Sequence, residues 1–418
     1  MRNSWSSPSL LVGTLACASV GLNFVATKVW GHEGHTHPPA AKQANAEQAQ
    51  DDPYSVPEGT PDELLDFIRT ARERMQPKSV TDARRMFQAR EHAADHILEH
   101  AEAEASVRFE AATAKLESLA ALMKLGDIDA PNRLDHFVEQ GAKSESGEIG
   151  ELLSNIRLER KFARWNELQT DDREQLIDEL RSHVLVADVS WSRVRLALRF
   201  AEAAAETDDA PRAAELLREL LPHMAHSKAP RVANEVPMIA GVARRLELVG
   251  QPIEITGTTL EGNVLEWQSY EGKVVLIDFW ATWCPPCIAE MGEIEKLYNG
   301  YHEKGFDVVG VNLDSNRQEV EKFVRSRRLP WRNLFHDPRE GERAGQHPLA
   351  VEYGITMIPR AILIDRQGRV LSTRANSKVL GRLLREQLGP PVESQSGVTQ
   401  AKGEATPEGK VIDVNVKK

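Results

Sequence analysis

Apolar residues recur every three to four positions from Thr60 to about Leu248, which is the spacing of amphipathic helices. The first predicted helix begins with the sequence Thr60-Pro61-Asp62-Glu63, a capping box with proline in the first turn. Residues 81–125 contain neither glycine nor proline, and they predict one long helix, or two helices joined end to end, that stops at Gly126.

Shorter helical patterns follow this stretch, with Pro211 suited to a first turn and Gly250 closing the last helix. They lie at about 148–168, 171–186, 189–206, 211–226 and 231–248. No clean repeat period relates them, so the pattern indicates antiparallel helical packing and no named repeat family. We therefore predict an all-helical domain over residues 60–249, with Trp165 and Trp191 as anchors of its core.

The pattern changes beyond Gly250, where the continuous apolar run Val274-Val275-Leu276-Ile277 predicts a buried strand. Asp278, Phe279 and Trp280 extend this run, and a short turn then leads to an amphipathic helix. Two cysteines, Cys284 and Cys287, stand three positions apart at the start of that helix. This arrangement of strand, turn and helix is typical of a dithiol redox centre.

The spacing of the two cysteines suits redox chemistry, because two thiols in this arrangement can close a small disulfide ring between Cys284 and Cys287. Cys284 faces the free backbone N–H groups and the positive end of the helix dipole, which favour its thiolate, so we expect it to attack. Cys287 lies one turn inside the helix and is expected to resolve the mixed disulfide. Pro285 and Pro286 are tolerated in a first turn, where they stiffen the ring and remove amide donors near the attacking sulfur.

A zinc site and a structural disulfide are weaker interpretations of the cysteine pair. A Cys-x-x-Cys sequence can be half of a zinc site, but a structural zinc site usually has four ligands, and no second pair of closely spaced ligands follows Cys287. A purely structural disulfide is also disfavoured, because so short a loop restrains the unfolded chain very little.

The sequence "VLIDFWATWCPPC" resembles the active-site strand, turn and helix of the thioredoxin superfamily, and most closely its exported TlpA/ResA branch. The resemblance extends over about residues 250–388. "GQPIEITGTTLEGNVLEWQSYEGK" is similar to the β-hairpin and connection that precede the active-site strand, "GFDVVGVNLD" to the next buried strand, and "YGITMIPRAILIDRQGRV" to a cis-proline loop followed by a hairpin. The resemblance implies an α/β thioredoxin-like domain, a mixed central sheet flanked by helices, over residues 250–392.

The resemblance also implies roles for residues outside the cysteine pair. Pro359 aligns with the cis-proline of the family, and the bond before it would expose the backbone of Ile358 as a short edge for an extended substrate. Trp283 would shape the same docking surface. Asp278 aligns with a buried carboxylate whose raised pKa suits it to take the proton of Cys287 through a water. The alternative for Asp278 is a hydrogen-bonded residue at a strand end.

Three features depart from the family pattern. Gly292 stands where the family usually has a proline that kinks the helix, so a different bend is expected there. Arg360 follows the cis-proline, where a small hydroxyl residue is commoner, and would place a positive charge beside the substrate groove. The polar segment Asp337–Ala350, broken by proline and glycine, indicates a surface loop, either an insertion specific for a substrate or a spacer.

The composition is that of a soluble globular protein, and the net charge of −11 argues against nucleic acid or an anionic membrane surface as the main partner. Of the three cysteines, Cys17 lies in the leader, so the mature chain would hold only the redox pair. This usage leaves no other thiol to exchange with the active site.

The N-terminus indicates export. Residues 1–30 carry Arg2 and an apolar stretch from Leu10 to Val20, the pattern of a signal peptide or an N-terminal anchor. Cleavage after Ala18, a weak lipoprotein-like box ending at Cys17, and an uncleaved anchor to about Val29 remain alternatives, and each places the body outside the cytoplasm. Residues 31–59 form a polar linker rich in His, Pro and Ala. Residues 393–418 are predicted to be a disordered tail.

Two groups of histidines are weighed as metal sites. His32, His35 and His37 in the linker could hold copper or zinc loosely, but a flexible tract without further ligands is more often a spacer. His92, His96 and His100 share a helical face, but three ligands from one straight helix cannot surround a metal. We therefore predict no metal site and no cofactor.

These observations predict an exported thiol-disulfide oxidoreductase, periplasmic or tethered to the membrane and facing the periplasm. Its partners would be protein substrates, with apocytochrome c as one candidate, and an upstream membrane or periplasmic electron donor. A disulfide oxidase or isomerase is the alternative enzyme, and a reduction potential near about −120 mV instead of about −270 mV would indicate the oxidant. A redox-sensing recognition module whose helical domain binds a partner remains open, as does a copper-delivery protein. The sequence selects neither a role for the helical domain nor an oligomeric state.

Overall fold

The computed structural model describes residues 52–145, 147–338 and 347–392. The chain divides into two compact units, residues 1–243 and residues 244–418, which are described separately. The sequence places this division slightly later, between residues 249 and 250. The predicted leader, the histidines of the linker and the predicted tail lie outside the described residues.

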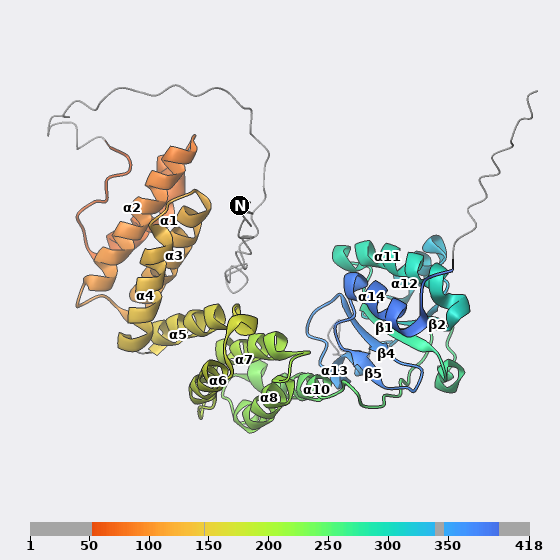
Figure 1. Cartoon of the computed structure of the whole chain (residues 1–418). Coiled ribbons are helices and arrows are strands. Elements are labelled where there is room, and N and C mark those ends of the chain that lie inside the picture. Colours follow the sequence, from red (N-terminus) through yellow and green to blue (C-terminus); the bar gives the residue numbers. More distant parts are fainter. Residues whose placement is uncertain (1–51, 146, 339–346, 393–418) are drawn as a thin grey trace, which may run out of the picture. The chain divides into compact units, whose positions relative to one another are not determined.

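The first unit is built from helices (Figure 1). The capping box at its start is present, because the Thr60 side chain accepts from the Glu63 N–H and the Glu63 carboxylate accepts from the Thr60 N–H. Trp165 is buried against Phe162 and Phe200, whereas Trp191 is half-buried beneath the guanidinium of Arg231. The helices are α1 Pro61–Met75, α2 Val80–Glu99, α3 Ala105–Lys124, α4 Ala130–Ser144, α5 Gly147–Phe162, α6 Thr170–Val184, α7 Trp191–Ala204, α8 Ala210–Ala225, α9 Pro230–Asn234 and α10 Val236–Leu246, the last of which ends in the second unit, and a 3₁₀ turn covers Trp165–Glu167.

The prediction for residues 81–125 is wrong in its geometry. The chain leaves the helical conformation at His100, and α2 and α3 pack against each other as an antiparallel hairpin. Ion pairs between Asp95 and Lys115 and between Arg90 and Glu117 join the two helices. The reason is tertiary: a helix pair that buries its apolar faces on each other is more stable than one long exposed helix. Helix α4 was not predicted, and the last predicted helix is divided into α9 and α10.

The break at His100 also changes the histidine group that the sequence places on one face. His92 and His96 lie on α2 with their ring centroids 5.2 Å apart, but His100 is the C-cap residue and has an extended backbone. All three are exposed. Within residues 52–145, 147–338 and 347–392, no group of three or more His, Cys, Asp or Glu side chains is arranged to hold a metal ion.

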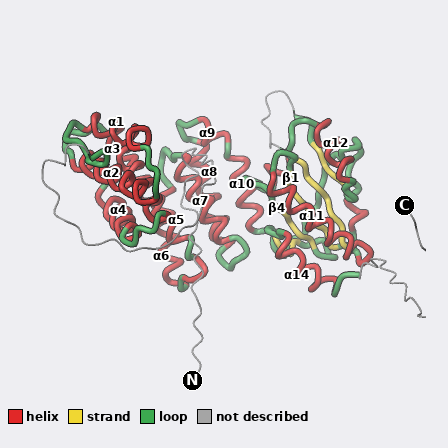
Figure 2. The backbone as a smooth tube through the Cα atoms, turned by 90° about the horizontal axis from the view of Figure 1, so that it is seen from above, coloured by secondary structure: helices red, strands yellow, loops and turns green. Residues whose placement is uncertain are grey.

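The second unit contains a five-stranded mixed sheet with strand order β3-β2-β1-β4-β5, as the resemblance implies. Its strands are drawn in yellow in Figure 2. The central strand β1 runs parallel to β2 and antiparallel to β4, β2 runs parallel to β3, and β5 is antiparallel to β4. The elements are β1 Val274–Trp280, α11 Pro285–Tyr301, β2 Phe306–Asn312, α12 Arg317–Arg327, β3 Arg332–Phe335, α13 Pro348–Glu352, β4 Arg360–Ile364, β5 Val370–Ser372 and α14 Ser377–Leu388, with 3₁₀ turns at Trp267–Tyr270 and His302–Lys304.

Every residue of β1 and β2 is buried, which explains their continuous apolar runs. Helices α11 and α14 lie side by side against the sheet (Figure 2). Helix α11 continues through Gly292 without interruption. No helix in the described part of the chain is long and apolar enough to span a membrane.

The segment before β1 covers both edges of the sheet. Near β5, the Gly250 N–H donates to the Val370 carbonyl at 2.8 Å, and Val370 donates back to Gln251 at 2.9 Å. Near β3, the Leu260 N–H donates to the Asn333 carbonyl at 2.7 Å. The hairpin implied by the resemblance is reduced to one bridge, Thr258 with Val264. Backbone groups of both edge strands are therefore paired in part within the unit.

Candidate active site

Cys284 occupies the N-cap position of α11. Its backbone is extended, and its Sγ accepts the N–H of Cys287 at 3.2 Å. Pro285 and Pro286 fill the first turn and have no N–H, so the donor that reaches this sulfur is the Cys287 amide. A sulfur in this position receives both a backbone donor and the positive end of the helix dipole.

The two cysteines form a disulfide in the structure, with their Cα atoms 5.3 Å apart. Both are buried, with exposed fractions of 5% for Cys284 and 3% for Cys287. Burial therefore does not distinguish the two sulfurs. Their positions differ, because only Cys284 lies at the helix end.

Asp278 lies on β1 and is buried among apolar residues. Burial, together with a smaller contribution from the nearby carboxylate of Glu290, raises the pKa of this carboxyl to about 7. No hydrogen-bond donor contributes to this shift in the pKa of Asp278. A carboxyl with a pKa in this range can change its protonation state near neutral pH.

Glu290 was not singled out from the sequence. It lies on α11, three residues after Cys287, and its carboxylate accepts the N–H of Ser377 at 2.5 Å, at the first turn of α14. Glu290 also lies close enough to Asp278 for its carboxylate to raise the pKa of that residue. The available signal was the i, i+3 spacing from Cys287, which places the two residues on one helix face.

The turn before Cys284 is fixed by a carboxylate that sequence reasoning also missed. Asp314 is buried, and it accepts the Thr282 N–H at 2.8 Å and the Thr282 hydroxyl at 2.5 Å. A third donor is the amide of Asn312, at 2.8 Å. Asp314 follows β2, which runs parallel to β1, so the carboxyl ends of the two strands meet at the cysteine turn.

Trp280 is anchored by its indole N–H, which donates to Asn333 Oδ1 at 3.1 Å. This bond requires glycine on β2, because a Cβ at Gly310 would lie only 2.2 Å from Asn333 Oδ1. Trp280 is fully buried and therefore supports the turn from beneath. Trp283, in contrast, is 59% exposed.

The Ile358–Pro359 peptide bond is cis. Strand β4 begins at the next residue, Arg360, which pairs with Phe279 on β1. This register places Pro359 beside the end of β1 that leads into the cysteine turn. Met357 is 56% exposed, and Ile358 and Pro359 are partly exposed. Together with Trp283, this segment presents apolar surface at the same end of the sheet.

Arg360 is the first residue of β4, and its place beside a substrate groove stays a prediction. It is buried, with 8% of its surface exposed, and it has interaction partners inside the protein. We attribute this to its position in β4, where every residue is buried. Asp337, at the start of the predicted loop, pairs with Arg317 at 2.7 Å, while residues 339–346 lie outside the described ranges.

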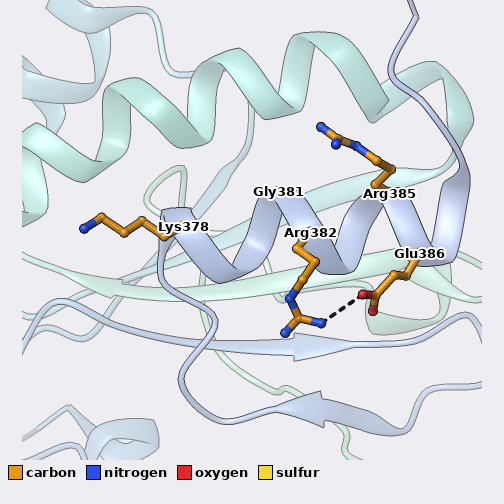
Figure 3. A pocket seen from close by; sticks show the side chains of 5 residues that line it. All are labelled: Lys378, Gly381, Arg382, Arg385 and Glu386. Atoms are coloured by element: carbon orange, nitrogen blue, oxygen red, sulfur yellow. Dashed lines mark hydrogen bonds and ion pairs between the residues drawn. The ribbon is translucent and has the colours of Figure 1, made fainter. Parts of the chain in front are cut away.

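A shallow concavity of about 490 Å³ lies on α14 (Figure 3). Arg382 and Glu386 form an ion pair across one helical turn within it. None of the residues predicted from the sequence lines it, so we do not assign it to the active site. Its lining residues are Lys378, Gly381, Arg382, Arg385 and Glu386.

Comparison with known proteins decides the family. The family model described as Redoxin matches residues 227–379. The thiol-disulfide oxidoreductase ResA of Bacillus thuringiensis subsp. konkukian (strain 97-27) is 30% identical over 144 residues, which cover 34% of this chain and 76% of that protein. The chain belongs to the ResA-like thiol-disulfide oxidoreductases of the thioredoxin superfamily. It is therefore an oxidoreductase.

A second curated relative covers a similar share of this ResA-like chain. ResA of Bacillus anthracis is 33% identical over 131 residues, covering 31% of this chain and 68% of that protein. Among solved structures, a thiol:disulfide interchange protein from a Bacteroides species is 24% identical, covers 37% of this chain and 96% of its own, and has a TM-score of 0.30.

Proposed function

We propose that this ResA-like chain reduces disulfides of protein substrates outside the cytoplasm, with Cys284 as the attacking sulfur and Cys287 as the resolving sulfur. The observation that carries the proposal is the N-cap position of Cys284, whose Sγ accepts the Cys287 N–H. Export rests on the apolar segment near the N-terminus and on the resemblance to exported relatives.

The proposed reaction has two exchange steps. In the dithiol form, the Cys284 thiolate attacks one sulfur of the substrate disulfide, the substrate S–S bond breaks, and the first substrate thiolate leaves and is protonated. Cys287 then loses its proton to Asp278 and attacks Cys284 Sγ, which releases the second substrate thiolate. The substrate gains two electrons, and the chain is left with the Cys284–Cys287 disulfide. An upstream dithiol donor must supply two electrons to begin the next cycle.

Two features of the site support the reductive direction. Pro285 and Pro286 remove two amide donors from the helix end, so the Cys284 thiolate is stabilised less than at an ordinary N-terminus. Asp278 and Glu290 place carboxyl groups in the same region, and negative charge there disfavours the formation of a cysteine thiolate nearby. In thiol-disulfide proteins, a strong oxidant is one whose reduced form is stabilised. A protein whose reduced form is stabilised less is therefore a stronger reductant.

Trp283 and the Met357–Pro359 segment are the proposed docking surface. Both are exposed and apolar, and the β1–β4 register places them at the same end of the sheet as the disulfide. An extended substrate would pair with the backbone of Ile358 and lay its side chains on Trp283 and Met357.

Trapping tests the proposal. The Cys287→Ser variant cannot resolve the mixed disulfide, so we expect it to retain disulfide-linked proteins on Cys284 when it is produced in a secreting bacterial host and recovered after acid quenching. Mass spectrometry would identify the attached proteins, and reduction would release them. The Cys284→Ser variant is the matched control and should capture none. Capture of the same proteins by both variants, or by neither, would contradict the assignment.

A further inference from the structure

Two consecutive arginines at the end of α10 contact the segment that leads to Pro359. Arg245 is fully buried, and its Nε donates to the Tyr353 carbonyl at 3.1 Å. Arg244 is exposed and donates to the neighbouring carbonyl of Glu352. Both contacts lie within the second unit, which starts at Arg244. Each joins residues 108 positions apart in the sequence.

The two carbonyls belong to the C-terminal end of α13, where Glu352 is the last helical residue and Tyr353 is the C-cap. The last carbonyls of a helix have no partner within the helix, and they carry the negative end of its dipole. The two positively charged guanidinium groups therefore bind the negative, C-terminal end of α13. The Ile355 N–H also donates to the Ala350 carbonyl at 2.8 Å, which turns the chain away from the helix.

The chain that leaves this helix end is short. Residues 354–359 connect it to β4, and they include exposed Thr356 and Met357 and the proposed docking edge at Ile358. The β4 end of the connection is held by the sheet register, in which Arg360 pairs with Phe279. The other end is held by α13 and hence by the two arginines. Their contacts are thus part of what sets the position of the docking edge.

We propose that Arg244 and Arg245 are positioning residues for protein substrates, which fix the Met357–Pro359 segment through the Glu352 and Tyr353 carbonyls. This inference rests on the proposed function and deepens it, because it assigns the recognition of an extended polypeptide to residues outside the sulfur chemistry. A buried guanidinium favours one hydrogen-bonded arrangement more than it adds stability, since its burial carries a desolvation cost. The two hydrogen bonds end on backbone carbonyls of α13 and not on the sulfur atoms.

The test compares two disulfides against the reduced full-length chain. One is a synthetic peptide disulfide with several residues on each side of the bond, which needs the docking edge. The other is dithiobis-nitrobenzoate, a small disulfide that does not. We expect Arg245→Met to lower the second-order rate with the peptide about tenfold, and Arg244→Ala to lower it less, in line with the loss of one charge-assisted hydrogen bond. The rate with dithiobis-nitrobenzoate should stay within about twofold, and the reduction potential should not change.

The matched control is Arg366→Ala, because Arg366 also donates to a backbone carbonyl, that of Lys304 at 3.3 Å, elsewhere in the same unit. It should leave both rates unchanged. Arg245→Lys, which restores one donor and the charge, should recover part of the peptide rate. If Arg245→Met does not fold, the exposed Arg244→Ala decides the matter alone.

The outcomes separate the two proposals. A wild-type chain that reduces neither disulfide refutes the proposed function, and the positioning role with it. A wild-type chain that reduces both, with Arg244→Ala and Arg245→Met equal to it on the peptide, refutes only the positioning role. Equal loss of both rates would also refute the positioning role, because it would show a general structural effect on the sulfur site.

Discussion

Replacing Cys284 with serine is expected to lower the rate of disulfide exchange by about a thousandfold or more, because a hydroxyl at neutral pH is a very weak nucleophile compared with a thiolate. The reduced full-length chain is mixed with dithiobis-nitrobenzoate in a stopped-flow instrument. In the wild type, one nitrothiobenzoate is released when Cys284 attacks, and a second when Cys287 resolves the mixed disulfide. We expect Cys284→Ser to lose the fast first phase, since the remaining Cys287 lies inside the helix and not at its N-terminal end.

Cys287→Ser is the matched control. It should retain the first phase at nearly the wild-type rate and lose the second, leaving one stable mixed disulfide per chain. The opposite pattern, a fast phase that survives in Cys284→Ser and disappears in Cys287→Ser, would reverse the roles of the two sulfurs.

Replacing Asp278 with asparagine is expected to slow the resolving phase about a hundredfold above neutral pH, the size typical of losing a general base. The pKa of Asp278 is raised to about 7, mainly by burial and further by Glu290. The carboxyl can accept a proton only when it is ionised, so the resolving rate of the wild type should rise with pH through about 7. The variant should lack this rise while keeping the first phase.

Glu290→Gln provides the control for this assignment. It keeps Asp278 and removes the second cause of the raised pKa, so the rise of the resolving rate should move to lower pH without disappearing. If Asp278→Asn leaves the resolving phase and its pH dependence unchanged, Asp278 is not the proton acceptor.

The same carboxyl gives stability a defined pH dependence. Because the folded-state pKa of Asp278 lies above the value near 3.9 of an unfolded chain, the folded protein binds more protons between about pH 4 and pH 7. The free energy of unfolding therefore falls as pH rises through that window, and the whole loss is present above about pH 7. Urea unfolding of the oxidised chain should show Asp278→Asn to be more stable than the wild type at pH 8, by a few kcal/mol at most, with little difference at pH 4.

Sequence reasoning located those parts of the site that lie close together in the chain. Cys284, Pro285, Pro286 and Cys287 form one continuous motif whose chemistry follows from its spacing and from the helix that it begins. The same holds for the helix start at Thr60, where the capping box uses residues three positions apart. Both features depend on residues that are close in the sequence, so they form in the same way whatever the rest of the fold.

The features that sequence reasoning missed depend on contacts between distant residues. The carboxylate of Asp314 meets Thr282 across 32 positions, Glu290 meets Ser377 across 87, and Arg245 meets Tyr353 across 108. None of these pairs has a local spacing that would mark it, because the folding of the chain around the sheet brings them together. In the sequence, each member is only one more charged or polar residue.

In the helical unit, too, a feature that depends on tertiary contacts could not be predicted from the sequence. Residues 100–104 contain no glycine or proline, so the break between α2 and α3 has no local cause. It arises because α3 folds back on α2, where Lys115 pairs with Asp95. Most of the helices could therefore be predicted from periodicity, whereas α4 and the direction of each helix could not.

The pH dependence of iodoacetamide alkylation in the reduced full-length chain, with each cysteine followed by peptide mass spectrometry, tests the assignment of Cys284 as the attacking sulfur. We expect Cys284 to react first and fast at neutral pH, with a midpoint below the value of about 8.5 for a free cysteine, because its sulfur caps α11. Equal and slow reaction of both cysteines at neutral pH, or earlier reaction of Cys287, would contradict this assignment.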